Sequence, residues 1–222
     1  KRRMKCMAKN KAESLQKGGK RGTSARDGKN SLSPEMIDQV KIKRLKNLLS
    51  SAFSDHILFM KNYISACDER NDGLAANMDE AINENSRELL AIIEKYLPGY
   101  EPEEFIDRES IIKQFMEIWD EYIDSVKSLV VGGDTGNDSM ARDGLRRLFL
   151  VKNKMVKYFV NILSEIAEEE ELETILNSWV THLQGYIESR DNDDFATSFQ
   201  HLQDWQKAKE DLAKMLATWI FG

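Results

Sequence analysis

The sequence predicts an all-α protein, an antiparallel bundle of about six helices preceded by a basic N-terminal tail. The 222 residues include only 3 Pro and 12 Gly, too few chain-breaking residues for many short strands. Apolar residues recur at helical spacing over most of the chain. No apolar run approaches the ~20 residues of a transmembrane helix, so we predict no membrane span.

The tail is defined by its charge. Residues 1–30 hold eleven Lys and Arg against Glu13 and Asp27, a net charge of +9, so the total of −6 leaves −15 for residues 31–222. A basic segment poor in apolar residues is typical of a flexible tail, which we assign to residues 1–32. The basic residues are Lys1, Arg2, Arg3, Lys5, Lys9, Lys11, Lys17, Lys20, Arg21, Arg26 and Lys29.

The first two helices are predicted from their boundary residues. Residues 33–35 (Ser-Pro-Glu) indicate a helix start, because Ser caps well, Pro fits the first position and an acid suits the first turn. The helical period then continues to a break at residues 68–73 (DERNDG). A second helix is expected to run to about residue 97, before Pro98-Gly99.

Four further helices are predicted in the remainder of the chain. They are expected at about residues 107–131, 140–166, 167–190 and 193–221. The segment 132–139 (GGDTGNDS) is predicted to be a loop, and it lacks the GK[ST] of a phosphate-binding P-loop. The acidic run 167–173 suits the start of its helix, because the helix dipole favours carboxylates there.

An internal repeat appears at an offset of 123 residues, which places Gly99 on Gly222. Identical residues then meet at Leu49 and Leu172, Tyr63 and Tyr186, Ile64 and Ile187, Asp68 and Asp191, and Leu89 and Leu212. We therefore predict a duplicated helical hairpin within the bundle of residues 33–222, with repeat units at about 45–99 and 168–222. The helices over residues 107–166 are expected to link the two copies. Because Gly222 matches the end of the first unit, we expect the repeat to finish with the chain.

A family resemblance follows from this register. The first unit carries His56, Lys61, Ile64, Asp68, Asn85, Leu89, Tyr96 and Gly99. The second carries Trp179 in the place of the His, then Ile187, Asp194, Phe195, Trp219 and Gly222, and Asn153 lies between the units. With these residues, positions 45–222 resemble an uncharacterised family of small duplicated helical proteins with one His per repeat, found in bacteria, archaea and some large DNA viruses. The resemblance implies a helical bundle but no activity, and Trp179 argues against paired histidines across the repeats.

The three histidines are the weak candidates for a metal site. His56 lies on an apolar stripe predicted to face the core, so we interpret it as a core residue. His182 and His201 flank a turn at similar distances, so antiparallel helices would bring them to similar height. We interpret both as residues at the edge of an apolar face. The chain has neither H-E-x-x-H nor E-x-x-H, and we predict no metal and no cofactor.

Enzymatic chemistry is not expected. The acidic residues Glu117, Asp120, Glu121 and Asp124 are interpreted as a solvated helix face. Cys6 and Cys67 have no catalytic signature around them, and no G-x-S-x-G occurs. The four tryptophans occupy apolar helical positions, where packing in the core is the expected role, and they are Trp119, Trp179, Trp205 and Trp219.

The charge split favours a structural or interaction protein. Its tail would tether nucleic acid or an acidic protein, and its bundle would join a homo- or hetero-oligomeric assembly. A virion component is one candidate, because the resembled family occurs in viruses. The alternative is a bundle that binds a small ligand or a metal at a core histidine. Membrane-surface binding is less favoured, because no amphipathic apolar face accompanies the charges. The two isolated cysteines, and a start (KRRMKCMAKN) without an apolar leader, predict a reducing, intracellular compartment.

Overall fold

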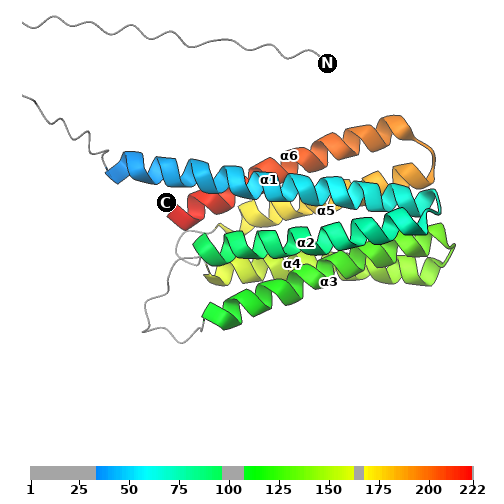
Figure 1. Ribbon diagram of the computed structural model, residues 1–222, viewed down its shortest axis with the longest axis horizontal. Coiled ribbons are helices and arrows are strands. Elements are labelled where there is room, and N and C mark those ends of the chain that lie inside the picture. The colour runs from blue at the N-terminus through cyan, green and yellow to red at the C-terminus, as the bar shows by residue number, and fades with distance from the viewer. Residues whose placement is uncertain (1–33, 97–107, 163–167, 222) are drawn as a thin grey trace, which may run out of the picture. The chain divides into compact units, whose positions relative to one another are not determined.

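The computed structural model describes residues 34–96, 108–162 and 168–221. These residues form six α-helices (Figure 1), and no strand occurs among them, which confirms the predicted all-α class. The helices are α1 (Pro34–Asp68), α2 (Asp72–Tyr96), α3 (Arg108–Asp134), α4 (Asp138–Ile162), α5 (Glu169–Asp191) and α6 (Phe195–Phe221).

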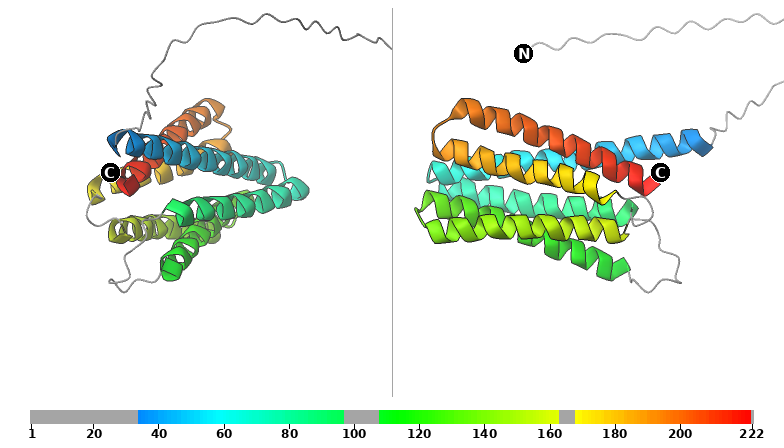
Figure 2. Two further views of the ribbon diagram at one scale, coloured as in Figure 1. Left: turned by 60° about the vertical axis from the view of Figure 1, so that its left-hand side comes forward. Right: turned by 180° about the vertical axis from the view of Figure 1, so that it is seen from behind.

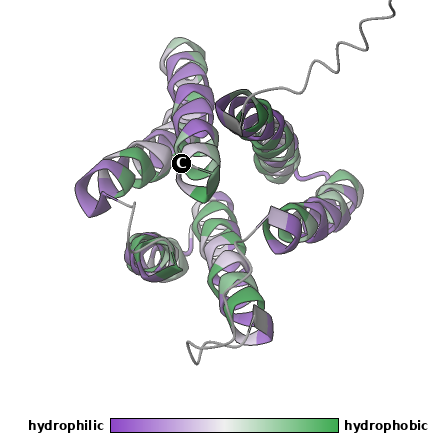
Figure 3. Ribbon diagram, turned by 90° about the vertical axis from the view of Figure 1, so that its left-hand side faces the viewer, coloured by the Kyte–Doolittle hydropathy of each residue, from purple (hydrophilic) through white to green (hydrophobic). Residues whose placement is uncertain are grey.

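The helices form three antiparallel hairpins, α1/α2, α3/α4 and α5/α6. The second helix of each hairpin packs against the first helix of another, so that α2 meets α3, α4 meets α5 and α6 meets α1. The view from behind shows α5 between α6 and α4 (Figure 2). Along the bundle axis, the helices surround a common centre (Figure 3). The first helices α1, α3 and α5 supply side chains to that centre.

The predicted loop at residues 132–139 is wrong at both ends. Helix α3 continues through its two glycines, and α4 already begins at Asp138. Gly132 lies directly against α4, since a Cβ there would be 2.4 Å from the backbone nitrogen of Ala141, whereas a Cβ on Gly133 would lie 3.2 Å from the Asp191 carboxylate. At Gly144 an added Cβ would likewise lie 2.6 Å from the backbone nitrogen of Leu129. The sequence predicts a chain break at Gly132, whereas Gly132 and Gly144 in fact allow α3 and α4 to pack closely.

All three hairpins turn in the same way, and the turns lie together at the right-hand end of the bundle in Figure 1. The second residue after the first helix has a left-handed backbone, with φ of 53° at Arg70, 67° at Gly136 and 57° at Asp193. The next residue donates its N–H to a carbonyl five residues back and so closes the first helix. These bonds run from Asn71 to Ala66 (2.8 Å), from Asn137 to Gly132 (2.7 Å) and from Asp194 to Ser189 (2.8 Å).

The residue that closes the first helix also caps the second. The side-chain oxygens of Asn71, Asn137 and Asp194 each accept a backbone N–H at 3.1 Å from the residue three positions later. Asn and Asp are favoured at this position because the side chain satisfies one of the free N–H groups of the first turn. One short motif thus ends one helix and starts the next in every hairpin.

The repeat is therefore threefold in geometry, whereas the offset of 123 predicts two copies with residues 107–166 as a linker. Corresponding turn residues are 66 positions apart between the first and second hairpins and 57 apart between the second and third. The two intervals add to the offset of 123 found in the sequence. The middle copy was missed because the unequal spacing between hairpins defeats any single offset.

The core follows the same threefold arrangement. Met60, Val126 and Leu183 occupy corresponding positions on α1, α3 and α5, and each is 0 % exposed. Burying a large aliphatic side chain contributes about 1.5–3 kcal/mol, so this layer is a substantial part of the stability. Trp119, Trp179, Trp205 and Trp219 are all buried, as the apolar spacing predicted.

Candidate functional site

The polar centre of the bundle joins one side chain from each hairpin. His56 on α1, Tyr122 on α3 and Trp179 on α5 occupy corresponding positions, and all three are buried. The indole N–H of Trp179 donates to the Tyr122 hydroxyl at 3.1 Å, and that hydroxyl lies 3.4 Å from Nε2 of His56. Since Tyr122 accepts from the indole, its own proton is free to be donated to His56.

His56 is neutral in this environment. Burial lowers its pKa from 6.5 to about 3, opposed by hydrogen bonding to Asn85. If Nε2 accepts the tyrosine proton, Nδ1 carries the imidazole hydrogen. Nδ1 of His56 and Oδ1 of Asn85 both lack a partner with good hydrogen-bond geometry, although the amide nitrogen of Asn85 donates to the Ala52 carbonyl at 2.9 Å. A histidine held neutral to so low a pH cannot exchange protons near neutrality, which fits its interpretation as a core residue.

Two buried lysines fasten neighbouring hairpins together. Lys152 on α4 donates to the Asn177 side chain of α5 at 2.6 Å, and Lys209 on α6 donates to the Ser54 hydroxyl of α1 at 2.8 Å. Both lysines, each 8 % exposed, occupy corresponding positions in their hairpins, and so do their acceptors. The first hairpin has Ser86 at this position, which accepts the indole N–H of Trp119 at 3.1 Å. These contacts join neighbouring hairpins and pair the ammonium groups of both buried lysines.

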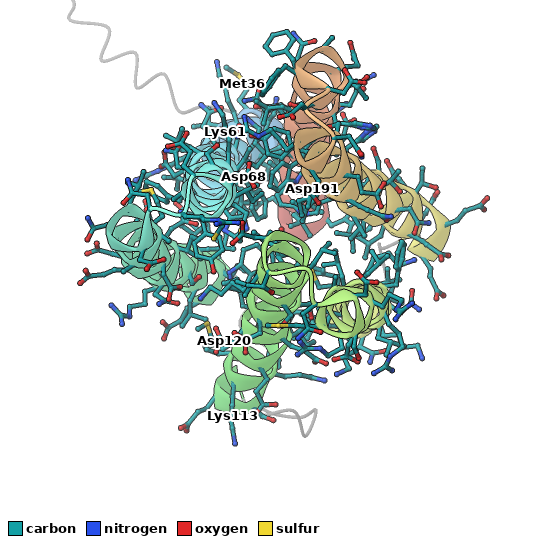
Figure 4. All side chains as sticks on the ribbon, turned by 90° about the vertical axis from the view of Figure 1, so that its right-hand side faces the viewer. Met36, Lys61, Asp68, Lys113, Asp120 and Asp191 are labelled. Carbon is teal, nitrogen blue, oxygen red and sulfur yellow. The ribbon has the colours of Figure 1, made fainter. Side chains whose placement is uncertain are left out.

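The turn end of the bundle gathers negative charge. Asp68, Asp134 and Asp191 are the last residues of α1, α3 and α5, and Asp68 and Asp191 lie near each other in Figure 4. Arg190 donates to Asp68 from Nη2 at 2.8 Å and from Nε at 3.1 Å, and its guanidinium lies 5.5 Å from the Phe195 ring. These residues border a hollow of about 330 Å³.

The carboxyl group of Asp191 lies among other negative charges at this end. Burial, then repulsion from Asp68, Glu188 and Asp134, raises the pKa of Asp191. The negative ends of three helix dipoles add to the same effect. Arg190, at a position where the other hairpins have Cys67 and Gly133, is the cation in contact with this group.

His182 and His201 meet at the edge of the third hairpin. Both rings are half-buried, and their Nδ1 atoms are 3.3 Å apart, with ring centroids 5.6 Å apart and planes inclined at 46°. Their spacing about the turn indicated similar height, and the structure adds direct contact. Gly185 makes room for the pair, since a Cβ there would lie 2.4 Å from Nε2 and from Cε1 of His201.

The other candidates from the sequence are solvated or shielded. Among the four acidic candidates on α3, Glu117, Asp120 and Asp124 are exposed and Glu121 is half-buried. Glu117 pairs with Lys113 at 3.9 Å, and Glu121 pairs with Lys154. Asp120, labelled in Figure 4, is exposed as a residue, but partial desolvation of its carboxyl group and repulsion from Asp124 raise its pKa. Cys67 is half-buried, and burial raises the pKa of its thiol, which lowers its reactivity.

Several predictions fall outside the described residues. They concern the tail with its eleven basic residues, Cys6, Pro98-Gly99 and Gly222. Sequence reasoning also missed Tyr122, Arg190 and the two buried lysines. Tyr122 could have been found from its place 66 residues after His56, had the middle repeat been recognised. The lysines gave no signal, because their residue type predicts exposure.

Comparisons of the chain with protein-family models, with curated proteins and with solved structures gave no match. None of the helices in the described part of the chain is long and apolar enough to cross a membrane. Among the same residues, no group of three or more His, Cys, Asp or Glu side chains could hold a metal ion.

Proposed function

We propose that this chain is a non-enzymatic structural or interaction protein, whose basic residues 1–30 tether nucleic acid while its acidic helical bundle takes part in an assembly. The observation that carries the proposal is the charge split, +9 in residues 1–30 against −15 in the remainder. Basic segments bind phosphate backbones by releasing counterions, which requires no fixed fold in the segment. An acidic body is repelled by the same polyanion, so contact would be confined to the tail.

The contacts inside the bundle support a scaffold role. The polar side chains at the centre hydrogen-bond to one another across hairpins, as the Trp179, Tyr122 and His56 series does. The alternative of a ligand site at His56 has less support, because its ring is 0 % exposed and packs against Trp119 and Trp179. A small internal cavity nearby is bordered by Tyr122 and Trp179 but not by His56.

Exposed aromatic side chains support the assembly part of the proposal. Phe195 and Phe199 are each 60 % exposed and lie four residues apart, on one face of the first turns of α6. Aromatic residues are enriched in protein–protein contacts relative to the remaining surface. The proposed assembly is homo- or hetero-oligomeric, with a virion as one candidate. The size of the native complex tests this part of the proposal.

The tethering part is tested with a variant in which the eleven basic residues of positions 1–30 are replaced by Gln in the full chain. Binding of labelled duplex DNA and of single-stranded RNA is measured by fluorescence anisotropy from 50 to 300 mM salt. The affinity of the unaltered chain should fall steeply with salt, with a slope of log affinity against log salt that is roughly proportional to the number of phosphates contacted. The variant should lose this binding. Unaltered binding of nucleic acid by the variant contradicts the proposal. If the unaltered chain binds poly-glutamate as a third probe but neither nucleic acid, its partner would instead be an acidic protein.

A further inference from the structure

The contact between His182 and His201 has the dimensions of a metal chelate. For Zn–N bonds of about 2.0–2.1 Å, an ion equidistant from two Nδ1 atoms 3.3 Å apart subtends an N–Zn–N angle of roughly 104–111°. This range includes the tetrahedral angle that Zn²⁺ prefers. The contact is long for a direct hydrogen bond, because the distance from an N–H nitrogen to its acceptor atom is usually about 2.9–3.0 Å.

We propose that His182 and His201 form a two-histidine site for a divalent transition-metal ion, Zn²⁺ by its geometry. Each neutral imidazole offers a lone pair at Nδ1 and keeps its hydrogen on Nε2, the donor type that suits zinc. Water completes the coordination, because the described residues place no third metal-ligating side chain at the pair. Such a site is open and exchangeable, unlike the closed four-ligand sites that hold a fold together.

The packing around the pair is specific to this hairpin. Gly185 lies in the interior of α5, where glycine is less favourable to the helix than alanine. Its lack of a side chain gives the ring of His201 the space it occupies against α5. The helix therefore accommodates the contact at the expense of its own stability.

The threefold repeat shows that the position does not demand histidine. The residues facing each other at the same height are Phe59 and Met78 in the first hairpin, and Ser125 and Gly144 in the second. An apolar pair and a small pair both suit the hairpin, so two half-buried imidazoles are not explained by packing alone. This inference is independent of the tail and of the proposed tethering function.

Imidazole NMR resonances of the full chain test the site directly, because the protein has only three histidines. Zn²⁺ alone is titrated, and His56, which is 0 % exposed, serves as the internal reference. We expect the ring signals of His182 and His201 to shift together and saturate at one ion per chain, with shifts typical of Nδ1 coordination, while those of His56 stay in place. Two static signals in excess zinc, or a shift of only one ring, would overturn the proposal.

Calorimetric titrations of matched variants provide the second readout. His182→Asn and His201→Asn each keep a polar group near the Nδ1 position but lose a metal ligand. Each should weaken zinc binding by at least ~10–100-fold, because that is the loss of affinity when only a hydrogen-bond partner of a metal ligand is removed. The double variant measures background binding by Cys6, Cys67 and surface carboxylates. Gly185→Ala keeps both histidines but displaces His201, and it should also weaken binding; circular dichroism checks that each variant is folded. Wild-type affinity in both single variants would refute the site.

Discussion

Removing the hydroxyl of Tyr122 should destabilise the bundle more than its size suggests. In Tyr122→Phe the indole N–H of Trp179 and Nε2 of His56 both lose their partner in the core. A buried polar group left unpaired costs about 1–3 kcal/mol. The contact to His56 is long, at 3.4 Å, so the cost of losing it lies at the lower end of that range. We therefore expect a total loss of about 2–4 kcal/mol in the free energy of unfolding.

Tyr158→Phe provides the matched control. Its hydroxyl is also in the core but donates one hydrogen bond, to the Ile111 carbonyl at 3.1 Å. A single hydrogen bond of this kind contributes about 0.5–1.5 kcal/mol. Both free energies are measured by urea unfolding, and an unchanged slope with denaturant would show that only stability has changed. If Tyr122→Phe costs no more than Tyr158→Phe, the hydroxyl of Tyr122 does not join the two rings, and the reasoning fails.

A double-mutant cycle tests the coupling itself. His56→Leu removes the ring that accepts from Tyr122 but leaves the Trp179 contact in place. In the His56→Leu background, Tyr122→Phe should cost less than in the wild type, with a coupling energy of about 0.5–2 kcal/mol. Additive costs would mean that the two side chains do not interact in the native state.

Two further predictions follow from buried and turn residues. Because the pKa of His56 is lowered to about 3 in the folded chain, the unfolded chain binds the proton more readily, so stability falls as the pH drops from 6.5 towards 3. Between pH 7 and pH 5, His56→Gln should lose about 2 kcal/mol less stability than the wild type in urea titrations, and parallel pH profiles would contradict this. In the turns, Arg70→Gly should stabilise by about 0.5–1 kcal/mol, because glycine accepts a left-handed backbone without strain, while Gly136→Ala should destabilise by a similar amount in thermal unfolding. Equal signs for these two substitutions would count against the shared turn geometry.

The fold class could be predicted because local signals agree along most of the chain. Apolar residues at helical spacing located every helix, and short polar segments located the turns. Gly132 is the exception, because a glycine in a loop cannot be told from a glycine at a tight helix contact by its residue type alone. The distinction depends on Ala141 of the opposite helix, which no local window contains.

The polar centre was only partly predictable. The position of His56 on an apolar stripe predicted its burial, but its partner Tyr122 depends on the placement of a different hairpin. Burial of Lys152 and Lys209 could not be predicted either, because their acceptors lie on neighbouring hairpins. Long-range contacts of this kind are fixed by the threefold arrangement, which a two-copy alignment does not contain.

The three hairpins provide an internal comparison of what the scaffold requires. The turn motif is retained in all of them, and the central position always carries a ring with a polar atom: His56, Tyr122 and Trp179. The Tyr122 hydroxyl contacts the other two rings, so a change at this position affects the neighbouring hairpins as well. The pair that faces across each hairpin is under no such constraint, being apolar in the first, small in the second and imidazole in the third. A binding site could therefore arise at His182 and His201 at little cost to the core, whereas a similar change at His56 would disrupt the centre of the bundle.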